Sequence, residues 1–220
     1  DPRIVPNARK MEEVTYDEML EMASLGAKVL HSRCVEIAKK YGVELLVCSS
    51  LNRNSGTMVR EKTKMEKMLI SGVAADKNVA KIRVAGLGND PESTFRLLNL
   101  LDRNNLNIDV MIQSLGKDGT KSVSFTVAKP DMLRTIDVLN DNKDLLGIKK
   151  LDYDENVAKV SVIGAGVRSH SGVAAKMFGA LANAGINTEM ITTSEIRITA
   201  LIDEAYADQA MRAIHETFLE

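Results

Sequence analysis

The stretch that decides the fold is GAGVRSHSGVAAKMFGALANAGIN, residues 164–187, in which glycines end a predicted strand and a helix follows. A dinucleotide-binding loop has this outline, but it requires a third glycine in the pattern G-x-G-x-x-G. Here Gly164 and Gly166 are followed by Ser169, which argues against a dinucleotide site. Such a loop still offers backbone N–H groups to any anion, including a carboxylate. The alternative, that the loop is only a capped connection, stays open.

The same pattern occurs once more, 80 residues earlier. Residues 84–114 align without a gap with residues 164–194, and this register pairs Asn107 with Asn187. Each copy predicts a strand, a helix, two further strands and a second helix with one apolar face. Two related modules therefore occupy most of the chain from residue 77 onward.

The helix in each module has a predicted start. Asp90 at the N-cap and Pro91 at the first helical position begin the first of them. In the second module, Ser169 or Ser171 is the expected N-cap.

Each module requires a fourth strand. The first has one in GIKKLDYD, residues 147–154, whereas the second reaches Glu220 without one. The alternating run MLISGVAAD, residues 68–76, precedes the first module and has no partner there, and an unpaired strand edge is unfavourable. We predict that this run crosses over and completes the second module.

The first 60 residues have a different pattern. Thr15 and Glu18 predict a capping box before two helices, which are interrupted near Gly26 and end at Gly42. VELLVCS, residues 43–49, is predicted as a buried strand, and a charged connector over residues 60–68 follows it.

Composition restricts the functional class. The chain has 220 residues, with 29 Lys and Arg against 30 Asp and Glu, so its net charge of −1 does not favour nucleic acid. We see no apolar run of about 20 residues for a membrane span. The two cysteines, Cys34 and Cys48, are predicted to be buried and to form neither a disulfide nor a metal site. A cytoplasmic location follows as an expectation.

Four stretches together carry a resemblance to a known family: DPRIVPNARK (residues 1–10), YDEMLEMASLGAKVLH (16–31), GAGVRSHSGV (164–173) and TSEIRI (193–198). They resemble aspartate kinase, and the two modules resemble its ACT domains, which bind free amino acids. The resemblance runs from Asp1 to about Phe218. It implies an α+β fold of tandem ferredoxin-like ACT domains (βαββαβ, antiparallel sheets with helices on one face), preceded by the end of an α/β amino-acid-kinase domain.

The implied domain boundaries follow from this resemblance. Residues 1–60 would be the end of the kinase domain, and residues 61–76 a linker plus the crossing strand. Residues 77–154 would be the first ACT domain. Residues 155–220, completed by 66–76, would be the second.

The resemblance also implies what the region lacks. The Lys-Phe-Gly-Gly motif and the aspartate-binding residues of the family lie upstream of DPR, so we expect no catalytic residue, no metal site and no cofactor here. ATP and Mg²⁺ would bind the full-length enzyme, which phosphorylates L-aspartate to 4-phospho-L-aspartate for lysine, threonine and methionine synthesis. Arg3 and Lys28 match residues that lie beside the nucleotide phosphates.

The implied effector site has more members. In this family an amino acid binds where ACT domains of two chains pair, so a homodimer is expected. The matching positions, carried over residue by residue, are Asn89, Asp90, Pro91, Glu92, Asn107, Ile108, Asp109, Gln113, Asn187, Thr188, Ser194 and Glu195.

Departures from the family pattern, among them Asn89, Glu92, Gly116 and Thr188, leave open whether lysine alone or lysine with threonine is the effector.

Two functions therefore compete. The first is the regulatory region of an aspartate kinase, inactive alone and joined to its catalytic domain. The alternative is a stand-alone amino-acid-sensing subunit that assembles with a separate catalytic kinase subunit. A small NAD-dependent oxidoreductase is a weaker third hypothesis.

Overall fold

The computed structural model describes residues 1–27, 29–51, 56–62 and 69–219. By its contacts the chain divides into two compact units. Unit 1 comprises Asp1–Lys77 with Lys159–Glu220, and unit 2 comprises Asn78–Ala158. Among the described residues, no helix is long and apolar enough to cross a membrane.

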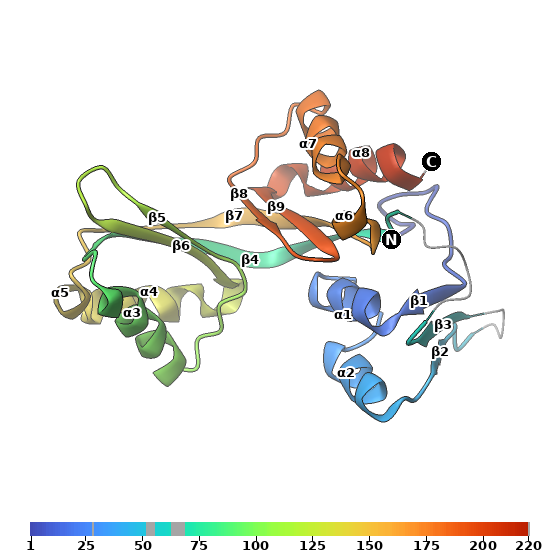
Figure 1. Ribbon diagram of the computed structural model, residues 1–220, viewed down its shortest axis with the longest axis horizontal. Coiled ribbons are helices and arrows are strands. Elements are labelled where there is room, and N and C mark those ends of the chain that lie inside the picture. The colour runs from blue at the N-terminus through green and yellow to red at the C-terminus, as the bar shows by residue number, and fades with distance from the viewer. Residues whose placement is uncertain (28, 52–55, 63–68, 220) are drawn as a thin grey trace. The chain divides into compact units, whose positions relative to one another are not determined.

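Unit 2 is a four-stranded sheet with helices. Its strand order is β5-β6-β4-β7, and β6 is antiparallel to both β4 and β5. Helices α3 and α4 lie together against one face of this sheet (Figure 1). Leu97 and Leu101 of α3, Phe125 of β6 and Leu139 of α4 are fully buried between them. The elements are β4 (Gly72–Leu87), α3 (Pro91–Arg103), β5 (Met111–Leu115), β6 (Lys121–Ala128), η1 (Lys129–Asp131), α4 (Met132–Asp141), α5 (Lys143–Leu146) and β7 (Lys150–Ile163).

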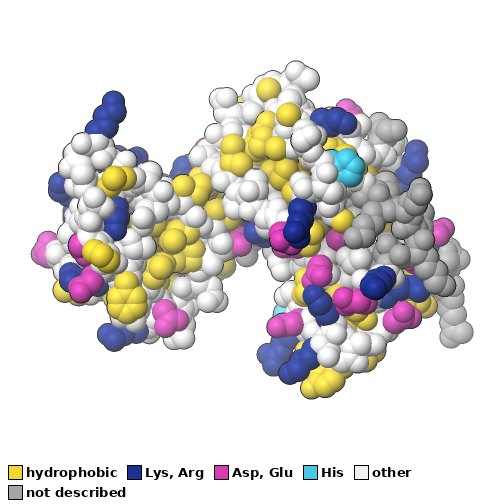
Figure 2. All heavy atoms as spheres, viewed as in Figure 1, with side chains coloured by type: hydrophobic (Ala, Val, Ile, Leu, Met, Phe, Trp, Pro, Cys, Tyr) yellow, Lys and Arg dark blue, Asp and Glu magenta, His cyan; other side chains and the backbone are white. Residues whose placement is uncertain are grey.

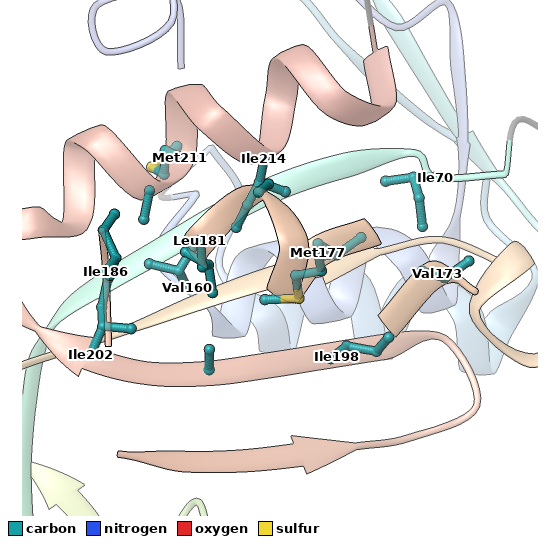
Figure 3. Packing of buried hydrophobic residues seen from close by; sticks show 14 of the residues in the cluster. Ile70, Val160, Val173, Met177, Leu181, Ile186, Ile198, Ile202, Met211 and Ile214 are labelled. Carbon is teal, nitrogen blue, oxygen red and sulfur yellow. The ribbon is translucent and has the colours of Figure 1, made fainter. Parts of the chain in front are cut away.

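The C-terminal part of unit 1 repeats this arrangement. Its strands follow the order β4-β7-β9-β8, and β8 is antiparallel to β9. Side chains of α7 and α8 gather over the sheet, with Met177 and Leu181 near the middle (Figure 3). Ile70, from the segment just before β4, lies in the same core. The elements are α6 (Gly166–Ser169), α7 (Val173–Asn183), β8 (Met190–Thr193), β9 (Arg197–Asp203), η2 (Glu204–Tyr206) and α8 (Ala207–Leu219).

The N-terminal part of unit 1 has its own small sheet and core. Strand order is β1-β3-β2, with β1 parallel and β2 antiparallel to β3. The capping box is confirmed, since Thr15 and Glu18 bond reciprocally at the start of α1, and Gly42 ends α2 in the left-handed conformation. The elements are β1 (Glu13–Thr15), α1 (Tyr16–Ser24), α2 (Ser32–Tyr41), β2 (Leu45–Val47) and β3 (Thr57–Arg60).

Strands β4 and β7 are longer than the sequence predicted. We expected residues 68–76 and the first strand of the first module to be separate, but residues 72–87 form one strand. Residues 147–154 and the next strand were likewise expected as two, and residues 150–163 are continuous. The boundary between the units falls inside both strands. The first module is βαββαβ in chain order, and the last is βαββα with the first residues of β4 as its fourth strand, which confirms the expected α+β class of tandem antiparallel modules.

Two further expectations are wrong. Cys34 and Cys48 are exposed rather than buried. The segment 43–49 contains only the three-residue β2, in which Leu46 is 59% exposed. By contacts, residues 1–60 and the last module both fall in unit 1, and the domain boundaries that the resemblance implies stay a prediction.

Candidate functional site

The glycines of residues 164–166 are required by a close approach of two backbones. A Cβ on Gly166 would lie 2.2 Å from the carbonyl oxygen of Leu69, and one on Gly164 would lie 2.7 Å from Cα of Ile70. The Gly166 N–H donates to Leu69 O at 3.0 Å, and the Ser71 N–H donates to Ile163 O at 2.8 Å. These glycines therefore serve the close packing of segment 69–71 against the loop.

Helix α7 begins later than expected. Its N-cap is Gly172, at a φ of 102°, and no side chain caps it, so the prediction of Ser169 or Ser171 was wrong. The short α6 comes between, and there Ser169 Oγ lies 3.4 Å from Ala165 O and 2.9 Å from His170 Nδ1. The first turn of α7 therefore presents N–H groups that no capping side chain covers, an arrangement suited to an anion.

The corresponding helix of unit 2 is capped as predicted. Asp90 Oδ1 accepts from the N–H groups of Glu92 and Ser93 at 3.0 and 2.9 Å, and Asp90 Oδ2 accepts from Ser93 Oγ. The bond from the Ser93 hydroxyl, followed by backbone N–H bonds, lowers the pKa of Asp90 below its ordinary value. The carboxylate of Asp90 thus takes two N–H groups that a ligand carboxylate would otherwise use.

Two side chains that the sequence did not single out lie at this helix start. Lys121 Nζ donates to the carbonyl of Asp90 at 2.7 Å, and Thr94 Oγ1 donates to Gln113 Oε1 at 2.6 Å. Gln113 of β5 and the start of α3 are therefore joined by a hydrogen bond. No local sequence signal identifies Lys121, because its approach to Asp90 depends on the pairing of β6 with β5, in which Lys121 lies opposite Leu115.

The other candidate residues of unit 2 lie before and along α3 and before β5. Asp109 is exposed and precedes β5, and its N–H donates to Thr126 O at 3.1 Å. Four extended residues separate Asp109 from Gln113, a span of about 13 Å, so the two would contact different parts of a ligand or different ligands. Glu92 pairs with Arg96 one turn along α3. Asn89 and Asn107 are exposed, Pro91 occupies the first turn of α3, and Ile108 is partly buried.

In unit 1 the candidates fall into two groups. Glu195 pairs with Arg168 at 3.0 Å, and the Ser194 N–H donates to Arg197 O at 2.8 Å, so this turn lies beside the glycine loop. Asn187 and Thr188 are exposed before the opposite end of β8. The four residues of β8 separate the groups by about 13 Å. Arg168 is a further residue that the sequence did not indicate.

The nucleotide candidates receive little support. Arg3 is 88% exposed on its side chain and pairs with Asp1 at 2.6 Å. Lys28 lies outside the described residues. Within the described ranges, no cluster of His, Cys, Asp and Glu could hold a metal ion.

The edge of unit 2 beside this site is apolar and exposed. All five residues of β5 are exposed, among them Met111 at 41% and Leu115 at 62%, and Phe95 on α3 is 65% exposed. Figure 2 shows hydrophobic side chains at the surface among charged ones. An exposed strand edge with apolar side chains is suited to pairing with another strand.

Fold and site together define a class of protein: two βαββαβ modules attached to part of an α/β domain. The ACT domain family model matches residues 160–218, and the amino acid kinase family model matches residues 1–49. The aspartokinase of Pseudomonas aeruginosa is 42% identical over 221 residues, covering 99% of this chain and 54% of that protein. The chain thus spans about half the length of this curated relative.

Solved structures of aspartokinases also match this chain. A crystal structure of aspartokinase alpha and beta subunits is 42% identical with a TM-score of 0.64, covering 68% of this chain and 98% of the other. Aspartokinase III of E. coli, in complex with lysine and aspartate in its T-state, is 27% identical with a TM-score of 0.80, covering 100% of this chain and 49% of the other. The chain belongs to the aspartate kinase family.

Proposed function

We propose that this chain is the amino-acid-sensing regulatory region of an aspartate kinase. The observation that carries the proposal is the pair of related modules, each with a strand-to-helix loop beside polar side chains of the next strand or of the turn that follows it. The parent enzyme would transfer the γ-phosphoryl group of ATP, with Mg²⁺, to the side-chain carboxylate of L-aspartate, forming 4-phospho-L-aspartate. Lysine, threonine or both would inhibit it by feedback, in the pathway that makes lysine, threonine and methionine. We place it in the cytoplasm.

The chemistry of unit 2 suits a free amino acid. Asp109 supplies a carboxylate for an ammonium group, and Lys121 with the Gln113 amide supplies donors for a carboxylate. Because about 13 Å separates Asp109 from Gln113, the two would serve different ligand molecules or the two ends of one long ligand. Charge-assisted bonds of this kind are stronger than neutral ones. Because Asp90 takes the N–H groups of Glu92 and Ser93, the ligand carboxylate would depend on side-chain donors more than on the helix start.

The exposed edge of unit 2 supports a homodimer. Pairing of β5 and α3 with the same elements of a second copy would cover Phe95, Met111 and Leu115 in a self-complementary way. A site beside β5 would then be completed by the second copy. Sedimentation that shows a stable monomer at micromolar concentration would contradict this part of the proposal.

The chain alone would not turn over ATP. The family resemblance places the aspartate-binding residues and the Lys-Phe-Gly-Gly motif upstream of residue 1. A coupled ADP assay with aspartate should give no rate above background.

A stand-alone regulatory subunit is the second candidate, and one observation favours it. The chain covers 98% of a chain from the structure of aspartokinase alpha and beta subunits. In that case a separate catalytic subunit is the partner. The coding sequence upstream of Asp1 distinguishes the two: an in-frame Lys-Phe-Gly-Gly motif indicates one long enzyme, and a start codon near Asp1 indicates a subunit.

A thermal-shift panel of the twenty amino acids tests the common element of both candidates. We expect lysine, threonine or the two together to raise the melting temperature, because a ligand that binds only the folded state stabilises it. A panel without any such shift would contradict the proposal, and a shift with NADH would favour the oxidoreductase instead.

A further inference from the structure

Two carboxylates on one face of α1 connect this helix to the last module. Glu18 and Glu21 are three residues apart and so lie on the same side of the helix. Glu18 Oε1 accepts from Ser71 Oγ at 2.5 Å, and Glu21 Oε2 accepts from Arg197 Nη1 at 2.9 Å. All four residues belong to unit 1.

The two oxygens of the Glu18 carboxylate accept from different residues, one from Ser71 and the other from Thr15. The second oxygen accepts from the Thr15 N–H at 3.1 Å and from Thr15 Oγ1 at 2.8 Å, which completes the capping box of α1. Glu18 is 8% exposed, so water does not readily replace these partners. A displacement of Ser71 therefore acts directly on the first turn of α1.

Ser71 is held in turn by the glycine loop. Its N–H donates to Ile163 O at 2.8 Å, and two residues earlier Leu69 O accepts from the Gly166 N–H at 3.0 Å. Because Gly164 and Gly166 leave no room for even a Cβ, the segment 69–71 cannot stay in place when this loop moves.

Arg197 provides the second connection. It follows the turn of residues 194–196, in which Ile196 O accepts from the Gly164 N–H at 2.9 Å. The side chains of Arg197 and Glu21 are 19% and 24% exposed. The buried Nε of Arg197 has no acceptor among the described residues. Glu21 therefore accepts a single hydrogen bond, from Nη1, and the pair is not bidentate.

We propose that the Glu18–Ser71 and Glu21–Arg197 contacts couple the last module to the amino-acid-kinase segment. A change in the turns 164–172 and 194–197 on amino-acid binding would pass through Ser71 and Arg197 to α1. All four are positioning residues. The ligand-dependent part of this inference rests on the proposed function.

The test uses the full chain with Glu21→Gln, Ser71→Ala and the double variant. Asp17→Asn is the matched control, because Asp17 is also on α1 but pairs with Lys39 of α2, at 2.5 Å. Calorimetry measures binding of lysine and threonine, and amide hydrogen exchange measures the opening of α1 with and without them.

We expect the ligand to change exchange in α1 of the unsubstituted chain and of Asp17→Asn. The double variant should bind within about threefold of the unsubstituted affinity and lose most of this change. A double variant that keeps the full change in α1, or that loses binding, would overturn the proposal.

A second arm requires no ligand, so it separates failure of the coupling from failure of the proposed function. Gly166→Ala should displace residues 69–71 and speed exchange in α1 several-fold, as local opening does. Its effect on α1 should not add to that of the double variant, because both act through the same contacts. Faster exchange at residues 69–71 with α1 unchanged would overturn the coupling even if no amino acid binds.

Discussion

Replacing Gly166 by alanine tests whether the glycine loop exists for packing. The new methyl group would lie 2.2 Å from Leu69 O and 2.5 Å from Leu69 Cδ1, and the first of these is backbone that cannot rotate away. Overpacking of this kind costs about 1–3 kcal/mol. Loss of the 3.0 Å bond from the Gly166 N–H to Leu69 O adds about 0.5–1.5 kcal/mol.

The expected destabilisation is therefore about 1.5–4.5 kcal/mol, measured by urea unfolding. At about 2–4 °C per kcal/mol for a chain of this size, the melting temperature should fall by roughly 3–18 °C.

Gly179→Ala is the matched control, because it makes the same substitution at an open position. Gly179 lies inside α7, where a Cβ would meet no neighbouring atom within 4 Å, so alanine there should stabilise the chain by about 0.5–1 kcal/mol. If Gly166→Ala unfolds at the same urea concentration as the unsubstituted chain, the backbones do not approach as described and the packing argument is refuted.

Three further predictions follow from the described residues. Asp90→Asn keeps an N-cap but removes the charge. Because folding lowers the pKa of Asp90, the variant should be less stable than the unsubstituted chain at pH 7, and this difference in the free energy of unfolding should disappear as the pH falls below about 4. Urea titrations that give the same difference at both pH values would contradict this. Cys34 and Cys48 should both react with a thiol reagent in native buffer, whereas labelling that requires denaturant would restore the buried interpretation. Met177→Ala, in the core of the last module, should cost about 2–5 kcal/mol, against about 0.5 or less for exposed Lys176→Ala, and equal unfolding midpoints for the two would contradict the assigned core.

The repeat explains why the modules could be predicted. Two copies in the same register specify the same order of elements, and the apolar periods fix which faces are buried. The sequence did not predict that β4 and β7 are each one continuous strand. The polar triplets Asp76-Lys77-Asn78 and Asp154-Glu155-Asn156 are typical of turns, yet both lie inside strands.

Tertiary partners explain how one of these triplets stays extended. Asp76 pairs with Lys159 of β7 at 3.2 Å, and Lys77 pairs with Asp208 of α8 at 2.8 Å. Lys159 is almost fully buried. Because these partners lie far along the chain, a local pattern contains no sign of them.

The residues of the candidate site could also be predicted only where their contacts are local in sequence. Glycine permits close approach to any neighbour, so Gly164 and Gly166 look alike in sequence whether they face a phosphate or a backbone. Asp90 was predictable as a cap because its bonds are local. Lys121 and Arg168 were not, since their contacts with Asp90 and Glu195 depend on how the strands pair.

Calorimetric titration with lysine, threonine and both together is the most direct test of the central claim, made on this chain and on Asp109→Ala. Asp141→Ala, an exposed carboxylate at the end of α4, serves as control. We expect binding by the unsubstituted chain and the control. Loss of one charge-assisted bond, worth about 1.5–3 kcal/mol, should weaken binding to Asp109→Ala about ten- to a hundredfold. Absence of binding by either amino acid, or unchanged affinity in Asp109→Ala, would contradict the account.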